Sequence, residues 1–399
     1  MIEVQFPFIL VRTRIGLSLM NSLGEAGFSK KIGFISMLIM PFLGGVMIYL
    51  LLNAINNMLV NPGVSRALRE LGPAANILLP GVNPYLPVLY GWVALLTAMV
   101  IHEYSHGIQA RANGMNVKSI GIVLFLIIPV GAFAEVDEKQ LEEAGIEKAW
   151  RVLSSGPVSN VLAAFAALVV FILLILTLKP VADGVLVVGL SSNGSAYQRG
   201  MRPGDIIMGV NGEQTPDWES FTTAVENAYK QGENITFNVS RNGFSNYTFT
   251  LERDLNSSGI LSAVPLKDVL EDYSSAFARS PVEGIVTYLM IPTAPFPWVY
   301  ETIPFSSLLQ KYYVSTLLGD DYHYLVNLFF WIWFINLNLG IFNALPLYPM
   351  DGGVALKLFC REKLSGRMSI KNIDRMTYAA SLVIFSLIIG LIILPYLTG

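Results

Sequence analysis

The chain has 399 residues, of which 53% are hydrophobic and 14% charged, and its formal net charge is −3. Soluble domains carry about 25% charged residues, so this composition excludes a soluble globular protein and predicts an integral membrane protein. No basic stripe supports a nucleic-acid partner. The single cysteine, Cys360, excludes an internal disulfide and a multi-cysteine metal site.

The amino-terminal stretch does not resemble a cleaved signal peptide, because Arg12 and Arg14 follow an apolar start without a small-residue cleavage site. A membrane-spanning helix needs about 20 apolar residues. The segments that meet this length are 33–59, 88–110, 152–178, 325–345 and 376–397. We expect about five to six transmembrane helices, the total depending on how 1–27 and 280–300 lie.

Two further apolar segments are too short or too broken to span. Residues 119–134 contain Pro129 and Gly131 and are rich in β-branched residues, which predicts a re-entrant β-hairpin buried against the helices. Residues 285–298 carry three prolines and are interpreted as interfacial.

The distribution of Lys and Arg predicts the orientation in the cell membrane. Basic residues precede the first span, lie between the second and third, and lie between the last two. The positive-inside rule therefore places the amino terminus in the cytoplasm. Residues 60–87 and 179–324 are then extracytoplasmic.

The second predicted span ends with two histidines four residues apart, His102 and His106, and Glu103 follows the first. On a helix, residues i and i+4 share a face, so both imidazoles can bind one metal ion. This H-E-x-x-H pattern is typical of zinc hydrolases, in which the glutamate acts as general base. Because ionisable residues are costly within a bilayer, the motif predicts a functional site.

A catalytic zinc site takes three protein ligands and keeps one open position. In this carboxylate-poor membrane domain the best candidate for the third ligand is Asp351, which follows two prolines and precedes two glycines. Such a loop is stiff on one side and permissive on the other, so it can interrupt a helix and direct one carboxylate. A structural capping role for Asp351 is the alternative.

Residues 180–256 are polar and rich in alternating strands. The stretch from Ala196 to Gly212, with Pro-Gly-Asp followed by Val-Asn-Gly, resembles a PDZ domain of the kind found in bacterial and archaeal proteases. Asn211-Gly212 is a hairpin signal, and Trp218–Tyr229 is expected to flank a groove for a peptide strand or C-terminus. The glycosylation-type sequons at Asn193, Asn234, Asn238, Asn246 and Asn256 agree with an exported location, although chance explains such a cluster equally well.

Together, H-E-x-x-H on one span and N-x-x-P-x-x-x-x-D-G at a later one resemble the site-2 protease family of intramembrane zinc metalloproteases. Gly156-Pro157-Val-Ser-Asn160 is similar to a further element of that family. The resemblance covers about residues 88–360 and implies cleavage of a transmembrane substrate, often after another protease has trimmed it. It implies zinc ligands at His102, His106 and Asp351 and a catalytic base at Glu103. It also implies substrate or transition-state contacts at Asn343 and Asn160. Ser105 and Met350 depart from the usual pattern without touching a ligand position.

The sequence thus predicts an α-helical polytopic membrane protein with a short re-entrant hairpin and an inserted α+β PDZ domain. The expected regions are a membrane domain at 1–179, the PDZ domain at 180–256, a linker of open role at 257–323, and a membrane domain at 324–399. An unwound substrate strand is expected to pair with the 119–134 hairpin. Alternatives are a metal-ion transporter and an inactive PDZ-bearing scaffold. His323 is interpreted as an interfacial residue without function, and the PDZ domain as either a size filter or a peptide receptor.

Overall fold

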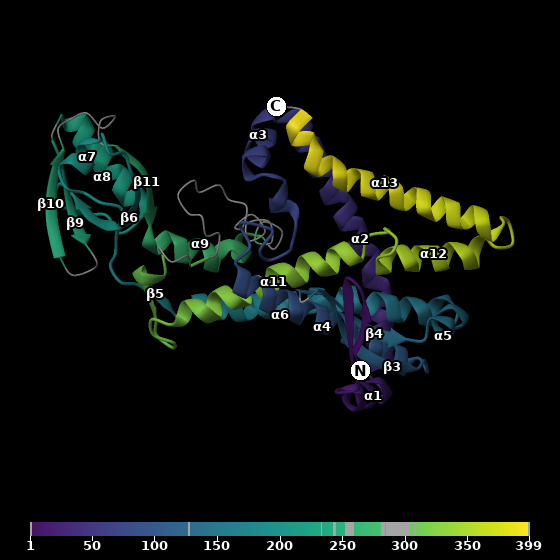
Figure 1. Ribbon diagram of the computed structural model, residues 1–399. Coiled ribbons are helices and arrows are strands. Elements are labelled where there is room, and N and C mark those ends of the chain that lie inside the picture. Colours follow the sequence, from purple (N-terminus) through teal and green to yellow (C-terminus); the bar gives the residue numbers. More distant parts are fainter. Residues whose placement is uncertain are drawn as a thin grey trace. The chain divides into compact units, whose positions relative to one another are not determined.

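The computed structural model describes residues 2–126, 128–232, 234–241, 245–251, 259–280, 284, 304–305 and 309–397 (Figure 1). They form two compact units. The first unit comprises Met1–Leu168 and Trp331–Gly399, and the second comprises Val169–Phe330. The predicted interfacial segment 285–298 lies outside the described residues.

Long helices dominate the first unit. They are α1 (Leu17–Glu25), α2 (Ser29–Val60), α3 (Pro62–Leu71), η1 (Pro73–Asn76), α4 (Val88–Ala112), α5 (Glu138–Glu143), α6 (Ile146–Ile175), α11 (Tyr322–Asn343), α12 (Asp351–Leu364) and α13 (Ile370–Leu397). The carboxyl end of α6 and the amino end of α11 continue into the second unit. Within the described ranges, α2, α4, α6, α11 and α13 are long and apolar enough to cross a membrane. Each overlaps one of the five predicted spans.

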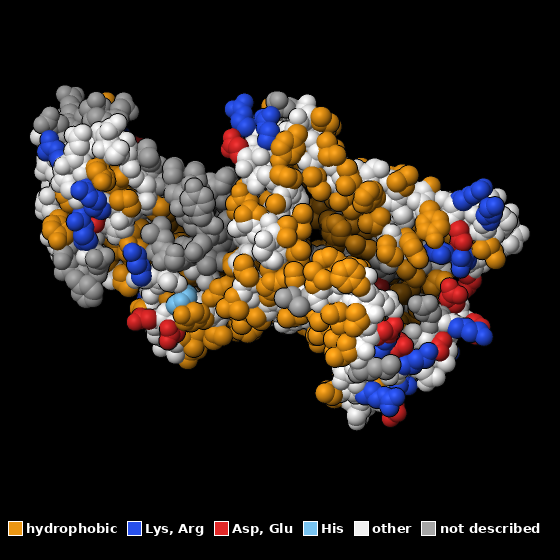
Figure 2. Space-filling model, in the orientation of Figure 1, with side chains coloured by type: hydrophobic (Ala, Val, Ile, Leu, Met, Phe, Trp, Pro, Cys, Tyr) orange, Lys and Arg blue, Asp and Glu red, His pale blue; other side chains and the backbone are white. Residues whose placement is uncertain are grey.

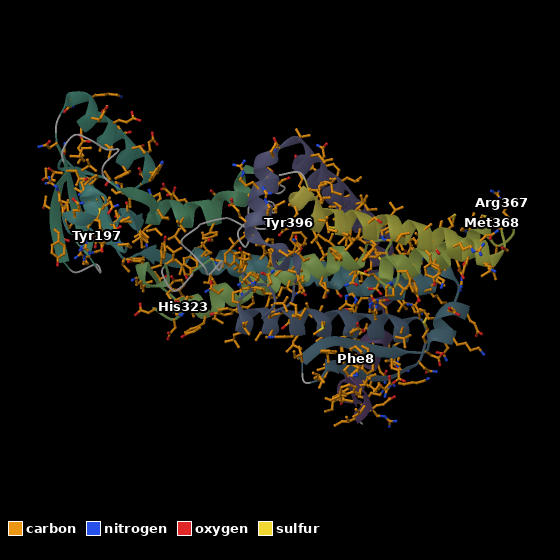
Figure 3. All side chains as sticks on the ribbon, turned by 45° about the horizontal axis from the view of Figure 1, so that its top comes forward. Phe8, Tyr197, His323, Arg367, Met368 and Tyr396 are labelled. Carbon is orange, nitrogen blue, oxygen red and sulfur yellow. The ribbon has the colours of Figure 1, made fainter. Side chains whose placement is uncertain are left out.

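Large apolar side chains are exposed on the surface of this helical unit. On α13, Leu382 and Val383 are 63% and 60% exposed. Figure 2 shows a largely hydrophobic surface over this helix, with charged side chains gathered near the α12–α13 connection. Arg367 and Tyr396 mark the two ends of that long apolar stretch in Figure 3. Hydrocarbon contact explains such exposure, which in water would be a large unpartnered apolar surface.

An antiparallel four-stranded sheet packs against these helices. Its strands are β1 (Ile2–Gln5), β2 (Phe8–Thr13), β3 (Val117–Phe125) and β4 (Ile128–Val136), in the order β1-β2-β3-β4. The predicted 119–134 hairpin is confirmed as β3 and β4. The pairing of an amino-terminal hairpin with β3 was not predicted; Phe8, labelled in Figure 3, lies opposite Phe125 with ring centroids 5.6 Å apart.

Small residues allow the helices to approach closely. A Cβ at Gly340 of α11 would lie 2.6 Å from the Pro157 carbonyl oxygen of α6. A Cβ at Gly44 of α2 would lie 2.6 Å from the Ala344 carbonyl oxygen. Membrane helices associate through such close backbone packing, because lipid supplies no hydrophobic drive for association. These contacts hold α6 and the end of α11 together at the level of the candidate site.

The second unit contains a six-stranded sheet in the order β10-β9-β7-β6-β11, with β8 paired to β7. Its elements are β5 (Leu178–Pro180), β6 (Val185–Leu190), α7 (Ser195–Gln198), β7 (Asp205–Val210), β8 (Glu213–Gln214), α8 (Trp218–Gln231), β9 (Ile235–Arg241), β10 (Ser245–Leu251), β11 (Ile260–Pro265), α9 (Leu266–Arg279), η4 (Gln310–Tyr312) and β12 (Tyr313–Ser315). Strand β12 pairs with β5.

Local sequence explains several of these elements. Asn211 and Gly212 have φ values of 49° and 88°, so both central residues of the β7–β8 turn are left-handed, as the predicted hairpin signal requires. Asp217 and Ser220 form a reciprocal capping box at the start of α8. Strand β11 lies beyond residue 256, so the sheet includes part of the segment that we expected to be a linker. The assignment of this α/β sheet to the PDZ fold stays a prediction.

The sequons are on accessible surface wherever the structure describes them. Asn193, Asn234, Asn238 and Asn246 are all exposed. Asn256 lies outside the described residues. Their use as glycosylation sites therefore stays a prediction.

One buried ion pair joins β7 to β9, and it gives a test of the second unit. Asp205 is 1% exposed and accepts two hydrogen bonds from Arg241, at 2.7 and 2.8 Å. Replacing Arg241→Ala leaves this carboxylate buried with the Arg202 N–H as a neutral donor but without its charged partner, so we expect a loss of about 3 kcal/mol in the free energy of unfolding of the sheet. Hydrogen exchange of the β7 and β9 amides in the full-length protein measures this loss.

The matched control removes an exposed charge from the same unit. Lys230 lies 3.4 Å from Glu226 on the surface of α8, and Lys230→Ala should change the exchange free energy by less than about 0.5 kcal/mol. Equal protection in the Arg241→Ala and Lys230→Ala variants would show that the buried pair does not stabilise the sheet.

Candidate metal centre

Helix α4 brings the two predicted histidines together. His102 and His106 are one helical turn apart and are 7% and 8% exposed. Their Nε2 atoms lie 3.0 Å from each other. The i, i+4 spacing therefore produces a pair of imidazole nitrogens that face one point.

Asp351 reaches the same point from a distant part of the chain. It is the first residue of α12 and follows the loop that leaves α11 at Asn343. Its Oδ2 atom lies 3.0 Å from His102 Nε2 and 3.3 Å from His106 Nε2. The predicted convergence of these three residues is therefore present in the structure.

The two glycines after Asp351 make this approach possible. A Cβ at Gly352 would collide with the carbonyl oxygens of Ala344 and Leu345, and one at Gly353 would collide with backbone atoms of Leu347 and Tyr348. The loop after α11 thus folds directly against the first turn of α12. Only residues without a side chain leave room for that fold, so the glycines set the position of the Asp351 carboxylate.

Hydrogen bonds on the far sides of the imidazoles fix their orientation. His106 Nδ1 lies 2.8 Å from the Val152 carbonyl oxygen, to which it donates. His102 Nδ1 lies 3.3 Å from the amide nitrogen Nδ2 of Asn160, and the amide oxygen Oδ1 of Asn160 is buried without a partner, so exchanging the two amide atoms satisfies both groups. An amide oriented with Oδ1 toward His102 accepts the Nδ1 proton, and the choice of amide orientation rests on such networks. Both Nε2 atoms are then left unprotonated, as metal ligands require.

The donor set fits a zinc ion. With both Nε2 atoms unprotonated, three electron-rich atoms converge with no proton between them, and Asp351 Oδ2 is a buried oxygen without a hydrogen-bond partner. Tetrahedral zinc bonds of about 2.0–2.1 Å place neighbouring ligand atoms about 3.3 Å apart. The observed separations are 3.0–3.3 Å. Among the described residues, no second group of His, Cys, Asp and Glu converges in this way.

Gly156 of α6 supplies the space that the imidazoles occupy. A Cβ at this position would lie 2.7 Å from His102 Nε2 and would collide with His106 Nε2. The Gly-Pro-x-x-Asn element thus has a double effect. Gly156 clears the site, and Asn160, one turn later and fully buried, contacts His102.

Glu103 lies beside this centre and contacts the sheet rather than the metal-ligand atoms. Its Oε2 atom accepts a hydrogen bond of 2.9 Å from the backbone N–H of Ala134 in β4. This N–H points away from β3, because successive residues of an antiparallel edge strand alternate their backbone groups between the two sides. The edge strand of the sheet therefore borders the candidate site.

The other residues singled out by sequence have simpler surroundings. Asn343 ends α11, is partly exposed, and donates to the Leu339 carbonyl. His323 contacts the Asp320 carbonyl at 3.1 Å and belongs to no metal-binding group among the described residues. Cys360 is a buried free thiol on α12.

Sequence reasoning missed the partners that are not characteristic residue types. The Val152 carbonyl and the Ala134 N–H are backbone groups, which no residue pattern indicates. Gly156 stood in a recognised element, but only the structure shows that its missing side chain makes room for the histidines.

A buried His-His-Asp group among helices of membrane length, with a glutamate on the first metal-binding turn, is the hallmark of one class of enzyme. The class that this site defines is a membrane-bound zinc hydrolase. Comparison with known proteins specifies this class further.

The family model described as Peptidase family M50 matches residues 90–388, so the chain belongs to this family, the site-2 proteases. It is 26% identical over 349 residues to an uncharacterised protein of Methanocaldococcus jannaschii, covering 86% of this chain and 75% of that protein. It is 27% identical over 225 residues to the regulator of sigma-W protease RasP of Bacillus subtilis, covering 52% and 49%. The zinc metalloprotease RasP of Geobacillus kaustophilus is 25% identical over 261 residues, covering 61% and 58%. The chain thus spans half to three-fifths of these two proteases.

The Gly156 contact gives a test of the metal centre. Gly156→Ala places a methyl group against both Nε2 atoms, so we expect zinc affinity to fall by at least about tenfold, as for other changes that misplace metal ligands. Competition with a fluorescent zinc chelator measures the affinity of the purified protein.

Gly45→Ala in α2 is the matched control, because a Cβ there meets no atom within 4 Å. This variant should bind zinc as the unaltered protein does. If Gly156→Ala also retains full affinity, the imidazoles do not use the space beside Gly156 when the metal is bound.

Proposed function

We propose that this protein is an intramembrane protease that cleaves peptide bonds within or near the transmembrane helices of membrane-protein substrates. The observation that carries the proposal is a buried three-ligand centre that borders the free edge of a β-sheet within a bundle of membrane-length helices. His102, His106 and Asp351 hold the zinc ion in this proposal. A bound zinc ion supplies Lewis acidity for hydrolysis of the peptide bond.

Glu103 is the proposed general base. It follows the first ligand on α4, so its carboxylate lies beside the metal site without being one of the three converging ligand atoms. In peptide hydrolysis this carboxylate takes a proton from the attacking water and then delivers one to the leaving amine nitrogen. The base and the acid of the two steps are therefore the same residue.

Strand β4 is the proposed docking edge for the substrate. A transmembrane helix must unwind before its carbonyl groups become accessible, and an unwound strand in a membrane needs new partners for its backbone groups. Addition to β4 supplies such partners. A substrate carbonyl that pairs with Ala134 N–H replaces Glu103 as acceptor and frees the Glu103 carboxylate for its catalytic role. Docking and activation of the base are then a single event.

The two asparagines receive different proposed roles. Asn343 is partly exposed at the end of α11, which suits a contact with the substrate or the transition state. Asn160 is fully buried and lies against His102, so its contacts favour the orientation of this ligand over the direct substrate role that the family resemblance implies. Asn160 is therefore a proposed positioning residue.

The remaining proposals concern the surroundings of the protease. The sheet at 184–265 is proposed to be a PDZ domain on the extracytoplasmic side that filters substrates by size or binds a peptide terminus. The amino terminus is proposed to be cytoplasmic. A metal transporter is not favoured, because the Glu103 carboxylate on α4 lies beside the centre and contacts the edge strand β4. Hydrolysis needs such a base and a docking edge, whereas transit of an ion does not.

Substitution of the proposed base separates the protease from its alternatives. Glu103→Gln keeps the size of the side chain and its bond to Ala134 but removes proton acceptance, so we expect cleavage of a model single-span helix in detergent to fall by at least about 10²-fold. Zinc content should stay at one ion per chain, by elemental analysis.

Asp351→Asn supplies the comparison, since it weakens a proposed ligand and should lower zinc content together with cleavage. Undiminished cleavage by Glu103→Gln would overturn the assignment of the base. Absence of both zinc and cleavage in the unaltered protein would instead support an inactive scaffold.

A proline in β4 tests the docking edge. Ala132 is two residues from Ala134, so its N–H also points outward, and Ala132→Pro removes this donor without removing a β3–β4 bond. We expect cleavage to fall at least about tenfold with zinc retained, because one substrate pairing site is lost. Ala132→Val, which keeps the N–H, should cleave normally; equal loss in both variants would point to side-chain crowding rather than strand pairing.

A further inference from the structure

A hollow in the first unit, separate from the metal centre, lies where several helices end. It has a volume of about 600 Å³ and is lined by the carboxyl ends of α1 and α4 and the amino ends of α2 and α6. A Cβ at Gly27, on its wall, would meet no atom within 4 Å. Because α2, α4 and α6 are membrane-length helices, this hollow is at the level at which they leave the hydrocarbon.

Its lining is predominantly cationic. Lys30, Arg111, Lys148 and Arg151 face two carboxylates, Glu25 and Glu147. Glu147 is paired with Arg151. No carboxylate of the described residues lies within an ion-pair distance of Lys30, Arg111 or Lys148. Like charges gathered in one hollow repel each other, and an anion removes that repulsion.

Hydrogen-bond donors and helix dipoles at this hollow also favour an anion. The Nε atoms of Arg111 and Arg151 are buried without an acceptor, while the Nη atoms of Arg111 donate to the Val117 carbonyl at 2.7 Å and to Asn116 Oδ1 at 3.4 Å, and those of Arg151 donate to Glu147. The positive ends of the α2 and α6 helix dipoles also point toward this region, which favours an anion. The opposing negative end of α4 is capped by its own chain, since Met115 N donates to the Ala110 carbonyl at 2.8 Å and Gly114 N to the Arg111 carbonyl at 3.0 Å.

A separate cavity lies between the same helices. It has a volume of about 240 Å³ and is lined by the apolar side chains of Leu23, Phe28, Ile32, Ile108 and Leu162 together with five serines and Gln109. On α2, α4 and α6, most of its residues lie one or two turns farther into the membrane-spanning part than those of the cationic hollow. A cationic hollow near the helix ends, with a partly apolar cavity farther along the same helices, suits the head and the first part of the chain of a lipid.

We propose that these two cavities bind an anionic phospholipid, with its phosphate group among Lys30, Arg111, Lys148 and Arg151 and one acyl chain between α2, α4 and α6. The bound lipid would tie together the helices that carry the metal centre. His106 precedes Arg111 by five residues on α4 and Gly156 follows Arg151 by five on α6, which is about 7.5 Å along each helix. A bound lipid would therefore stabilise the relative positions of α4 and α6 close to the metal centre.

The test measures lipid binding to the full-length Glu103→Gln protein, so its outcome is independent of proteolysis. Native mass spectrometry of the delipidated protein is used to titrate dioleoyl phosphatidylglycerol, dioleoyl phosphatidylcholine and glycerol 1-phosphate. We expect the anionic lipid to bind at least tenfold more tightly than the zwitterionic lipid. Glycerol 1-phosphate should not bind in the same concentration range, because it lacks an acyl chain.

Two exposed lysines provide the variant. Lys30→Gln with Lys148→Gln removes two cations that have no carboxylate partner among the described residues, and we expect phosphatidylglycerol affinity to fall at least tenfold. The control, Lys363→Gln with Lys371→Gln, removes two exposed cations outside the hollow and should change affinity less than twofold. Ile32→Trp, which fills the apolar cavity, should also weaken binding of the lipid.

Each contrary result overturns a defined part of the proposal. Equal affinity for the two lipids, or no effect of the Lys30/Lys148 variant, would overturn the anionic site. Tight binding of glycerol 1-phosphate, unaffected by Ile32→Trp, would show a site for a free phosphate compound and overturn the lipid assignment.

Discussion

The rest of the structure depends on three electron-rich atoms that lie close together in the interior of the protein. Two imidazole nitrogens and a carboxylate oxygen lie 3.0–3.3 Å apart, on helices that cross a medium without water to solvate them. Without a cation such an arrangement would be strongly unfavourable, because unpaired polar groups are costly in a low dielectric. Metal binding and the packing of α4 against α12 are therefore coupled, and the fold must supply both.

The small residues show how the fold meets this requirement. Gly156 clears space for the imidazoles, Gly352 and Gly353 bring the Asp351 turn against the end of α11, and Gly340 brings α11 against α6. At each of these positions the absence of a side chain allows neighbouring segments to approach more closely. Since side-chain packing drives helix association in lipid, the same contacts that assemble the bundle also set the geometry of the ligands.

The sheet adds to the bundle what helices cannot offer, a free backbone edge. Helical backbone groups are satisfied internally, so only an edge strand can offer hydrogen bonds to an unwound substrate. The N–H of Ala134 is engaged by Glu103 at 2.9 Å. The proposed base and the proposed docking edge thus share one hydrogen bond, which in this proposal connects substrate pairing to catalysis through a single exchange of acceptors.

The sequence by itself determined the membrane class, the five spans, the β3–β4 hairpin and the His102/His106 pair, because these depend on apolar length and on helical periodicity. It also indicated Asp351, through the unusual residues around it. Only the tertiary structure decided that Asp351 reaches the histidines, that Asn160 faces His102, and that residues 2–13 extend the sheet. These relations join segments far apart in the chain through backbone groups and absent side chains, and neither leaves a local pattern in the sequence.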